Sequence, residues 1–181
     1  MPNTKSFFHS EKHRISEKEI IEFVFQRFHD VKKINKIKNL ISFHTANKYM
    51  LMAHDQNELK ILGNIVASNK KILFSEIIDE YENHLKLAMS KSPTTKTHTN
   101  VIMRIFGYFL KSLNQNEKQM FFDRLEQYRV GKTTLGKILL EISDVSYRFD
   151  KTYLASQTYF LLYSDIDSKA LFQPNNQRKY E

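Results

Sequence analysis

Cysteine is absent from this sequence of 181 residues. Its absence excludes disulfide bonds, cysteine-ligated zinc, cysteine-bound iron–sulfur clusters and thiol nucleophiles. The sequence also lacks an unbroken apolar run of the roughly 18 residues that a membrane-spanning helix needs, and its first residues, MPNTKSFFHSEKHRIS, do not resemble a signal peptide. We therefore expect a soluble protein of the reducing cytoplasm that does not contact a membrane.

Glycine and proline are scarce, with 4 and 3 residues respectively. Few residues are thus available for the tight turns of β-hairpins, and helical spacing of apolar residues dominates instead. A chain of this length with 41% hydrophobic residues can bury one sizeable core. We predict an all-α fold, a compact single-domain bundle of about seven or eight helices. The predicted helical domain covers 16–164, between a flexible N-terminus at 1–15 and a loosely ordered tail at 165–181.

Helix starts are marked by capping boxes, in which a polar residue is followed three positions later by glutamate. The pairs are Ser16 with Glu19, Asp55 with Glu58, and Asn114 with Glu117. Apolar spacing predicts further helices at 37–53, 77–88, 101–113 and 135–145, and a short last one within 153–163.

The net charge of +8 and the isoelectric point of about 9.5 favour an acidic partner such as nucleic acid. Most of the basic residues are lysines. A surface of solvated lysines, without any bound partner, is therefore an alternative explanation.

Two familiar motifs are excluded. The stretch GKTT at 131–134 looks like the end of a phosphate-binding P-loop, but Glu126 stands where that loop needs its first glycine. The histidines form no HExxH motif, and without cysteine a zinc site would depend on carboxylates. We expect no metal site and no cofactor.

The stretch FHTANKYMLMAH, at 43–54, places polar residues on an apolar helix. At about 100° per residue, His44 and Lys48 fall at the centre of an apolar sector, and a second apolar sector lies opposite. The first contains Ile37, Leu40, Ile41, Leu51 and Met52, and the second contains Phe43, Ala46, Met50 and Ala53. We expect this helix to be covered on both sides.

A lysine at the centre of an apolar sector is costly unless it is paired or faces a cleft. We therefore expect Lys48 to have a polar partner near His98 or Asn100. Two interpretations of His44 and Lys48 remain open. They could act together in proton transfer, since they are one helical turn apart, or they could be an interior histidine and a lysine whose amine reaches solvent.

The stretch KSPTTKTHTNVIMRIFGYFLKSL, at 91–113, carries a second polar pattern. Opposite its apolar face, basic and aromatic residues recur at helical spacing, namely Asn100, Arg104, Tyr108 and Lys111. Lys96 and His98 lie near the predicted helix N-terminus, which favours an anion. Such a stripe suits a phosphate backbone and a stacked base, although an ordinary solvated helix face would have the same pattern.

Four groups of residues resemble the YbgA-like family, a helical domain of long-undefined function that occurs alone or fused to a desulfidase acting on 4-thiouridine in tRNA. The resemblance covers roughly 20–163. The first two groups are Phe43, His44, Lys48, Leu51, Met52, Ala53 and His54, and then His98, Asn100, Val101, Gly107, Tyr108 and Phe109. The last two are Tyr128, Arg129 and Gly131, and then Tyr153, Leu154, Gln157 and Tyr159.

The resemblance implies RNA binding, with tRNA as the expected partner and a separate tRNA-modifying or desulfidase enzyme as a second one. The chain has no cysteine to hold a catalytic cluster of its own. On this interpretation one helix supplies His44, Lys48 and His54, and another supplies His98, Asn100 and Arg104, to a common polar pocket. The whole expected binding set is His44, Lys48, His54, Lys96, His98, Asn100, Arg104, Tyr108, Lys111, Tyr128, Arg129 and Gln157.

Two other functions compete with this one. The first is an enzyme acting on a nucleotide-like substrate, with His44, Lys48 and His98 as its catalytic residues. The second is a helical adaptor whose lysine-rich surface binds an acidic protein. A deep closed pocket would favour catalysis, whereas an open basic surface would favour RNA.

Overall fold

A computed structural model describes residues 15–68 and 72–165, and every regular element in them is a helix. The all-α prediction is therefore confirmed. The described helices are α1 (Glu17–Ile34), α2 (Ile37–His54), α3 (Gln56–Ala67), α4 (Phe74–Met89), α5 (Thr95–Phe106), α6 (Gln115–Arg129), α7 (Leu135–Arg148), α8 (Thr152–Ala155) and α9 (Thr158–Tyr163). Most of the predicted terminal segments, 1–15 and 165–181, lies outside the described residues.

Polar caps set several of the helix starts, as the sequence predicts. Ser16 and Asn114 each form a complete capping box, at the starts of α1 and α6. Asp55 caps α3 by accepting hydrogen bonds from the backbone amides of Asn57 and Glu58. The side chain of Glu58 does not complete this box, because it binds Nδ1 of His84 at 2.7 Å.

Two predicted helices have different bounds in the structure. The helix expected at 101–113 is α5, which starts earlier, after a capping box of Thr94 and Thr97, and ends at Phe106. The stretch after it is built of turns, with short-range bonds such as that from the Phe109 amide to the Phe106 carbonyl. The last predicted helix is split into α8 and α9, because Gln157 between them has an extended backbone.

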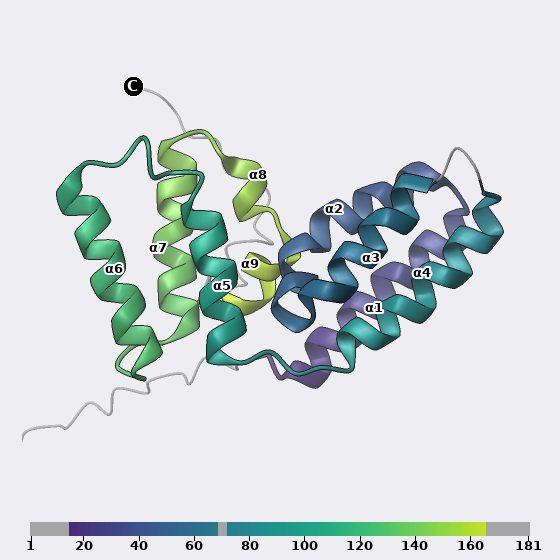
Figure 1. Cartoon of the computed structure of the whole chain (residues 1–181), viewed down its shortest axis with the longest axis horizontal. Helices are drawn as coiled ribbons and strands as arrows, with labels where there is room; N and C mark the ends of the chain where they lie inside the picture. The colour runs from purple at the N-terminus through teal and green to yellow at the C-terminus, as the bar shows by residue number, and fades with distance from the viewer. Residues whose placement is uncertain (1–14, 69–71, 166–181) are drawn as a thin grey trace, which may run out of the picture.

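The helices form two lobes, with α1–α4 in one and α5–α9 in the other (Figure 1). Each lobe has its own cluster of buried apolar residues. Helix α2 belongs to both, since Phe43, Met50 and Leu51 lie in the first cluster and Tyr49 and Ala53 in the second. The expectation that this helix is covered on both sides is confirmed.

Lys48 does not lie inside a buried sector, which agrees with the interpretation in which its amine reaches solvent. Lys48 is exposed, and Ile41 of the same sector is 40% exposed. The buried positions of α2 include Leu40, Phe43, Asn47, Tyr49, Met50, Leu51, Ala53 and His54. One side of α2 therefore faces solvent, and it carries Ile41, Thr45 and Lys48. The two lobes cover the helix on either side of these three residues.

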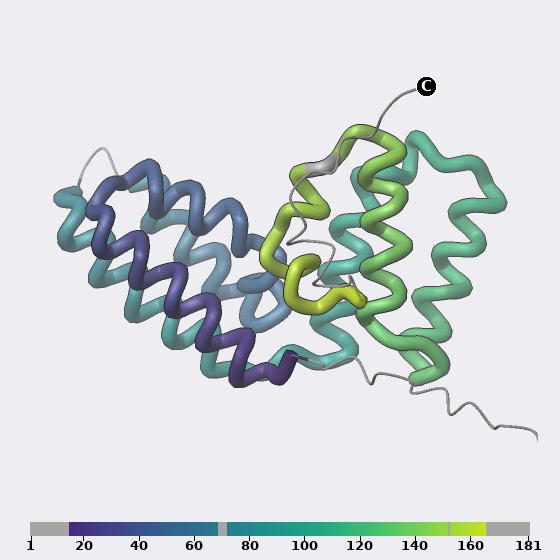
Figure 2. Tube along the Cα trace, turned by 180° about the vertical axis from the view of Figure 1, so that it is seen from behind, coloured from purple at the N-terminus to yellow at the C-terminus, as the bar shows by residue number. Residues whose placement is uncertain are grey.

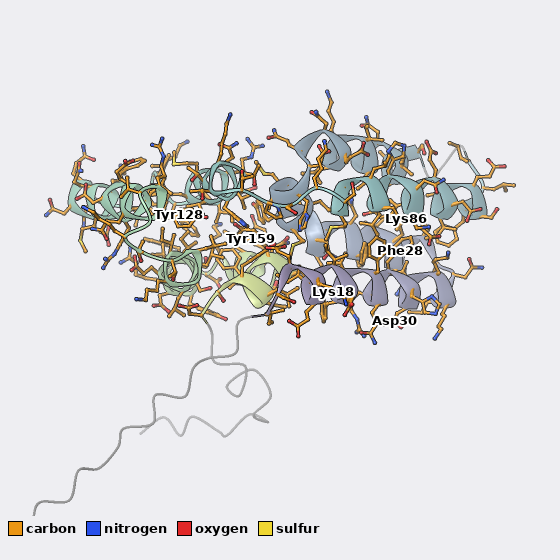
Figure 3. The ribbon with its side chains drawn as sticks, turned by 90° about the horizontal axis from the view of Figure 1, so that it is seen from below. Lys18, Phe28, Asp30, Lys86, Tyr128 and Tyr159 are labelled. Carbon is orange, nitrogen blue, oxygen red and sulfur yellow. The ribbon has the colours of Figure 1, made fainter. Side chains whose placement is uncertain are left out.

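The start of α1 lies beside α9, at the junction of the lobes (Figure 2). The phenol of Tyr163 donates hydrogen bonds to the carboxylate of Glu17, at 2.8 and 2.9 Å. Tyr159 also lies near the middle of the long axis, where the lobes meet (Figure 3). No helix in 15–68 or 72–165 has the length and apolar character needed to cross a membrane.

Candidate functional site

Three segments that are distant in sequence bring two cations and three tyrosines together. Lys48 and Tyr49 come from α2, Arg104 and Tyr108 from α5 and the turn after it, and Tyr153 from α8. We call these five residues the tyrosine–cation cluster. The rings of Tyr108 and Tyr153 meet edge to face, with centroids 6.3 Å apart. Tyr108 is 45% exposed and Tyr153 48%, so both rings are open to a ligand.

The buried side of the cluster is Tyr49, whose ring lies in the α5–α9 core. The ammonium of Lys48 lies 5.9 Å from the centroid of this ring, which is within the range of a cation–π contact. The exposed Lys48 is therefore positioned by an aromatic ring.

The electrostatics of the cluster favour negative charge at its surface. Hydrogen bonding with Tyr49 and Tyr153 lowers the pKa of Tyr108, and the positive charges of Lys48 and Arg104 lower it further. Burial raises the pKa of Tyr49. A negative charge therefore costs less at the exposed phenol of Tyr108 than at the buried phenol of Tyr49. The same field at the exposed phenol would stabilise a phosphate.

His44 has a structural partner, Tyr81, in the lobe of α1–α4. Its Nδ1 atom lies 3.0 Å from the phenol oxygen of Tyr81, which is fully buried among α1–α4. Burial lowers the pKa of His44, and the charge of Lys48 lowers it further. The imidazole is therefore held neutral against α4, with Lys48 on its solvent side.

His54 and His98 lie in a buried polar network at the junction of the lobes. Nδ1 of His54 lies 2.7 Å from the backbone carbonyl oxygen of Lys91, and since that oxygen can only accept, Nδ1 carries the proton. Nε2 of His54 lies 3.9 Å from the carboxylate of Glu17. Nδ1 of His98 lies 2.7 Å from the phenol oxygen of Tyr159.

Burial keeps both of these imidazoles neutral. It lowers the pKa of His98 to about 4, with the neighbouring His54 contributing in the same direction. It also lowers the pKa of His54, against the opposing effects of the Lys91 carbonyl and Glu17. Neutral buried histidines with protein partners stabilise the junction and do not offer positive charge to a phosphate.

The remaining residues of the expected binding set divide by exposure. Lys96, Asn100 and Lys111 are exposed, and so is Arg129, which pairs with Glu126 at 3.1 Å. Tyr128 is half-buried. Gln157 is buried, and its Nε2 donates to the carbonyl oxygen of Thr45 at 2.9 Å, which ties the α8–α9 junction to α2.

The expected set therefore separates into different places. Lys48, Arg104 and Tyr108 meet in the tyrosine–cation cluster, His54 and His98 meet in the buried network, and His44 binds Tyr81. The proposed catalytic set of His44, Lys48 and His98 has two of its members bonded to tyrosines of different lobes. Within the described residues, no three histidine or acidic side chains are arranged to hold a metal ion.

Sequence reasoning missed Tyr49 as a site residue and included Tyr153 only through the family resemblance. Tyr49 looks like an ordinary apolar position of α2, and nothing in the local spacing of 153–163 connects it to Tyr108. The family resemblance was the one signal that pointed to Tyr153. Only the tertiary structure shows where Tyr153 lies, because its ring contacts Tyr108 just after α5.

A family model described as protein of unknown function (DUF1722) matches residues 48–164. The uncharacterized protein YbgA of Escherichia coli (strain K12) is 26% identical over 146 residues, which cover 80% of this chain and 86% of that protein. No solved structure matches the chain. The family match includes all five residues of the tyrosine–cation cluster but not His44.

Proposed function

The chain belongs to the DUF1722 family, whose function is unknown, and on that premise we propose that it is an RNA-binding module whose binding surface is the tyrosine–cation cluster. One observation supports this proposal above the others. Lys48, Arg104, Tyr108 and Tyr153 come from three helical segments and converge on one exposed surface. An excess of solvated lysines alone would not predict exposed aromatic rings next to the cations.

The chemistry of the cluster suits an unpaired nucleotide. Two cations can each neutralise a backbone phosphate, and an exposed tyrosine ring can stack on a base. The two exposed rings are nearly perpendicular, at 86°, so a base stacked on one would meet the edge of the other. Bases are accessible in this way in loops, bulges and single strands, whereas in a duplex they are stacked and paired.

The proposed partner is tRNA, whose loops present such unpaired bases. The proposed role is auxiliary to a separate enzyme of thiolated-tRNA metabolism, following the resemblance described above. This chain has no cysteine, so it would not hold a cysteine-bound catalytic cluster itself. The overall charge of +8 supports encounter with any nucleic acid, and the cluster supplies the preference for unpaired bases.

The test is a filter-binding titration of the full chain with bulk tRNA across a series of salt concentrations. We expect affinity to fall with salt by roughly 0.7 log units per phosphate contact for each decade of salt. A short single-stranded RNA should bind more tightly than a duplex of the same length. Absence of salt-sensitive binding to tRNA would refute the proposal, and equal binding of duplex and single strand would refute the stacking role of the tyrosines.

A further inference from the structure

A cavity lies between α6, α7, the end of α5 and the turns after it. Helices α6 and α7 stand at the end of the molecule away from α1–α4 (Figure 1). Its volume is about 350 Å³. Its apolar lining is Phe106, Phe109, Leu113, Met120, Phe121, Ile142 and Val145. Cavities of this size with apolar walls are commonly filled by a ligand or by side chains of a partner.

Two ion pairs join the helices on either side of the cavity. Nε of Arg124 lies 3.2 Å from Glu141, and Nη1 of Arg148 lies 2.7 Å from Glu117. In each pair one residue comes from α6 and the other from α7, and all four line the cavity. The pairs hold α6 and α7 together while the space between them stays unfilled.

The same face exposes more apolar surface than a solvated helix needs. Helix α6 buries only Leu125, and Met120, which lines the cavity, is 67% exposed. An exposed apolar side chain at the edge of an apolar cavity is typical of an interaction surface.

The charges of this face differ from those of the whole chain. The cavity lining has three acids, Glu117, Glu141 and Asp144, against two arginines, whereas the chain carries +8. Among the described residues Asp144 makes no ion pair, and the guanidinium groups of Arg124 and Arg148 remain half exposed. A face that presents both signs can complement itself, as a symmetric interface requires.

We propose that the face formed by α6 and α7 is the interface of a symmetric homodimer. Each copy inserts exposed apolar side chains, Met120 first among them, into the cavity of the other. Asp144 of each copy then faces the half-exposed arginines across the two-fold axis. Two molecules of charge +8 repel each other less through this face, whose cavity lining has one more acid than arginine, than through a lysine-rich surface. Methionine has the flexibility to fill an irregular cavity.

The dimer leaves the tyrosine–cation cluster uncovered. Phe106 and Phe109 line the cavity, whereas Arg104 and Tyr108 of the same region are exposed and belong to the other cluster. The proposal therefore does not depend on RNA binding.

Sedimentation velocity of the full chain, free of nucleic acid and over a range of concentrations, tests the interface. We expect a concentration-dependent species of twice the 21.6 kDa monomer mass. Met120→Glu should weaken dimerisation by about tenfold or more, since it places a charge in the apolar centre of the interface. Asp144→Lys tests the α7 side of the same face, and it should also weaken the dimer because it places a positive charge opposite the arginines of the other copy.

The matched control is Leu87→Glu, which changes an exposed apolar residue of α4 in the other lobe and should leave the dimer unchanged. Because Met120 and Asp144 are exposed, their variants should keep the melting temperature of the monomer, which circular dichroism measures. A monomer at every concentration overturns the proposal. A dimer that resists both interface substitutions overturns it equally.

Discussion

Nδ1 of His98 lies 2.7 Å from the phenol oxygen of Tyr159, and both side chains are buried at the junction of the two lobes. The two residues come from α5 and α9, so this bond links the first helix of the α5–α9 lobe to its last helix. Burial favours the neutral imidazole, and the pKa of His98 falls to about 4. The pair thus makes the stability of the fold depend on pH.

Stability should fall as the pH drops from about 6.5 towards 4. The folded-state pKa of His98 lies below its value in the unfolded chain, so the unfolded chain takes up the proton first. The stabilisation is complete above the unfolded pKa and is lost as the pH approaches the folded pKa. A shift of this size corresponds to about 3 kcal/mol, and the lowered pKa of His54 acts in the same direction.

Urea denaturation at pH 7 and at pH 4.5 measures this loss. His98→Gln should reduce the pH dependence of the free energy of unfolding, while the exposed His29→Gln should leave it unchanged. An NMR titration that gave His98 a pKa near 6.5 would contradict the prediction directly.

Asp55→Ala should lower the free energy of unfolding by about 1–2 kcal/mol, because it removes the cap of α3. Asp55 also forms an ion pair with Lys91, and although burial raises its pKa, Lys91 and the amides of Glu58 and Asn57 lower the pKa overall. Asp55→Asn keeps an oxygen that can cap the helix and should cost less than Asp55→Ala. Thermal unfolding of both variants checks the order, and equal losses would show that the ion pair matters more than the cap.

Two glycines in helices should respond to alanine in opposite ways. A Cβ at Gly63 would lie 3.6 Å from Nε2 of His44, which is an ordinary contact, so Gly63→Ala should stabilise the protein by up to about 1 kcal/mol. A Cβ at Gly136 would lie 2.0 Å from Oδ1 of Asp165 and 3.1 Å from its backbone nitrogen. Gly136→Ala should therefore destabilise the protein, by roughly 1–3 kcal/mol, as thermal unfolding would show. Equal effects of the two substitutions would contradict the packing of 165 against α7.

Substitutions in the tyrosine–cation cluster should separate charge from stacking. Arg104→Ala and Lys48→Ala should each weaken tRNA binding and reduce the salt dependence by about one contact. Tyr108→Ala should weaken binding with little change in the salt dependence, because stacking releases few ions. These outcomes are measured by the same filter-binding titration.

The control for these variants is Lys38→Ala, which removes an exposed lysine from the first turn of α2, far along that helix from Lys48. It should have a much smaller effect. If Lys38→Ala weakens binding as much as Arg104→Ala, only the overall charge matters and the cluster is no binding surface.

The sequence by itself determined the helices and most of their starts. Apolar spacing and capping residues act within a few positions of the chain, so Ser16, Asp55 and Asn114 could be recognised as caps without knowledge of the fold. The double coverage of α2 could be predicted for the same reason, since its two apolar sectors are a property of one helix.

Only the tertiary structure decided which line of α2 remains open and which residues gather there. A lysine near apolar neighbours in a helical projection is exposed when the covering helices pack to either side of it, as happens to Lys48. The meeting of Tyr108 with Tyr153, and of His98 with Tyr159, depends on how α8 and α9 return to α5. Local spacing carries no information on that return, because it is set by the packing of segments that are far apart in the chain.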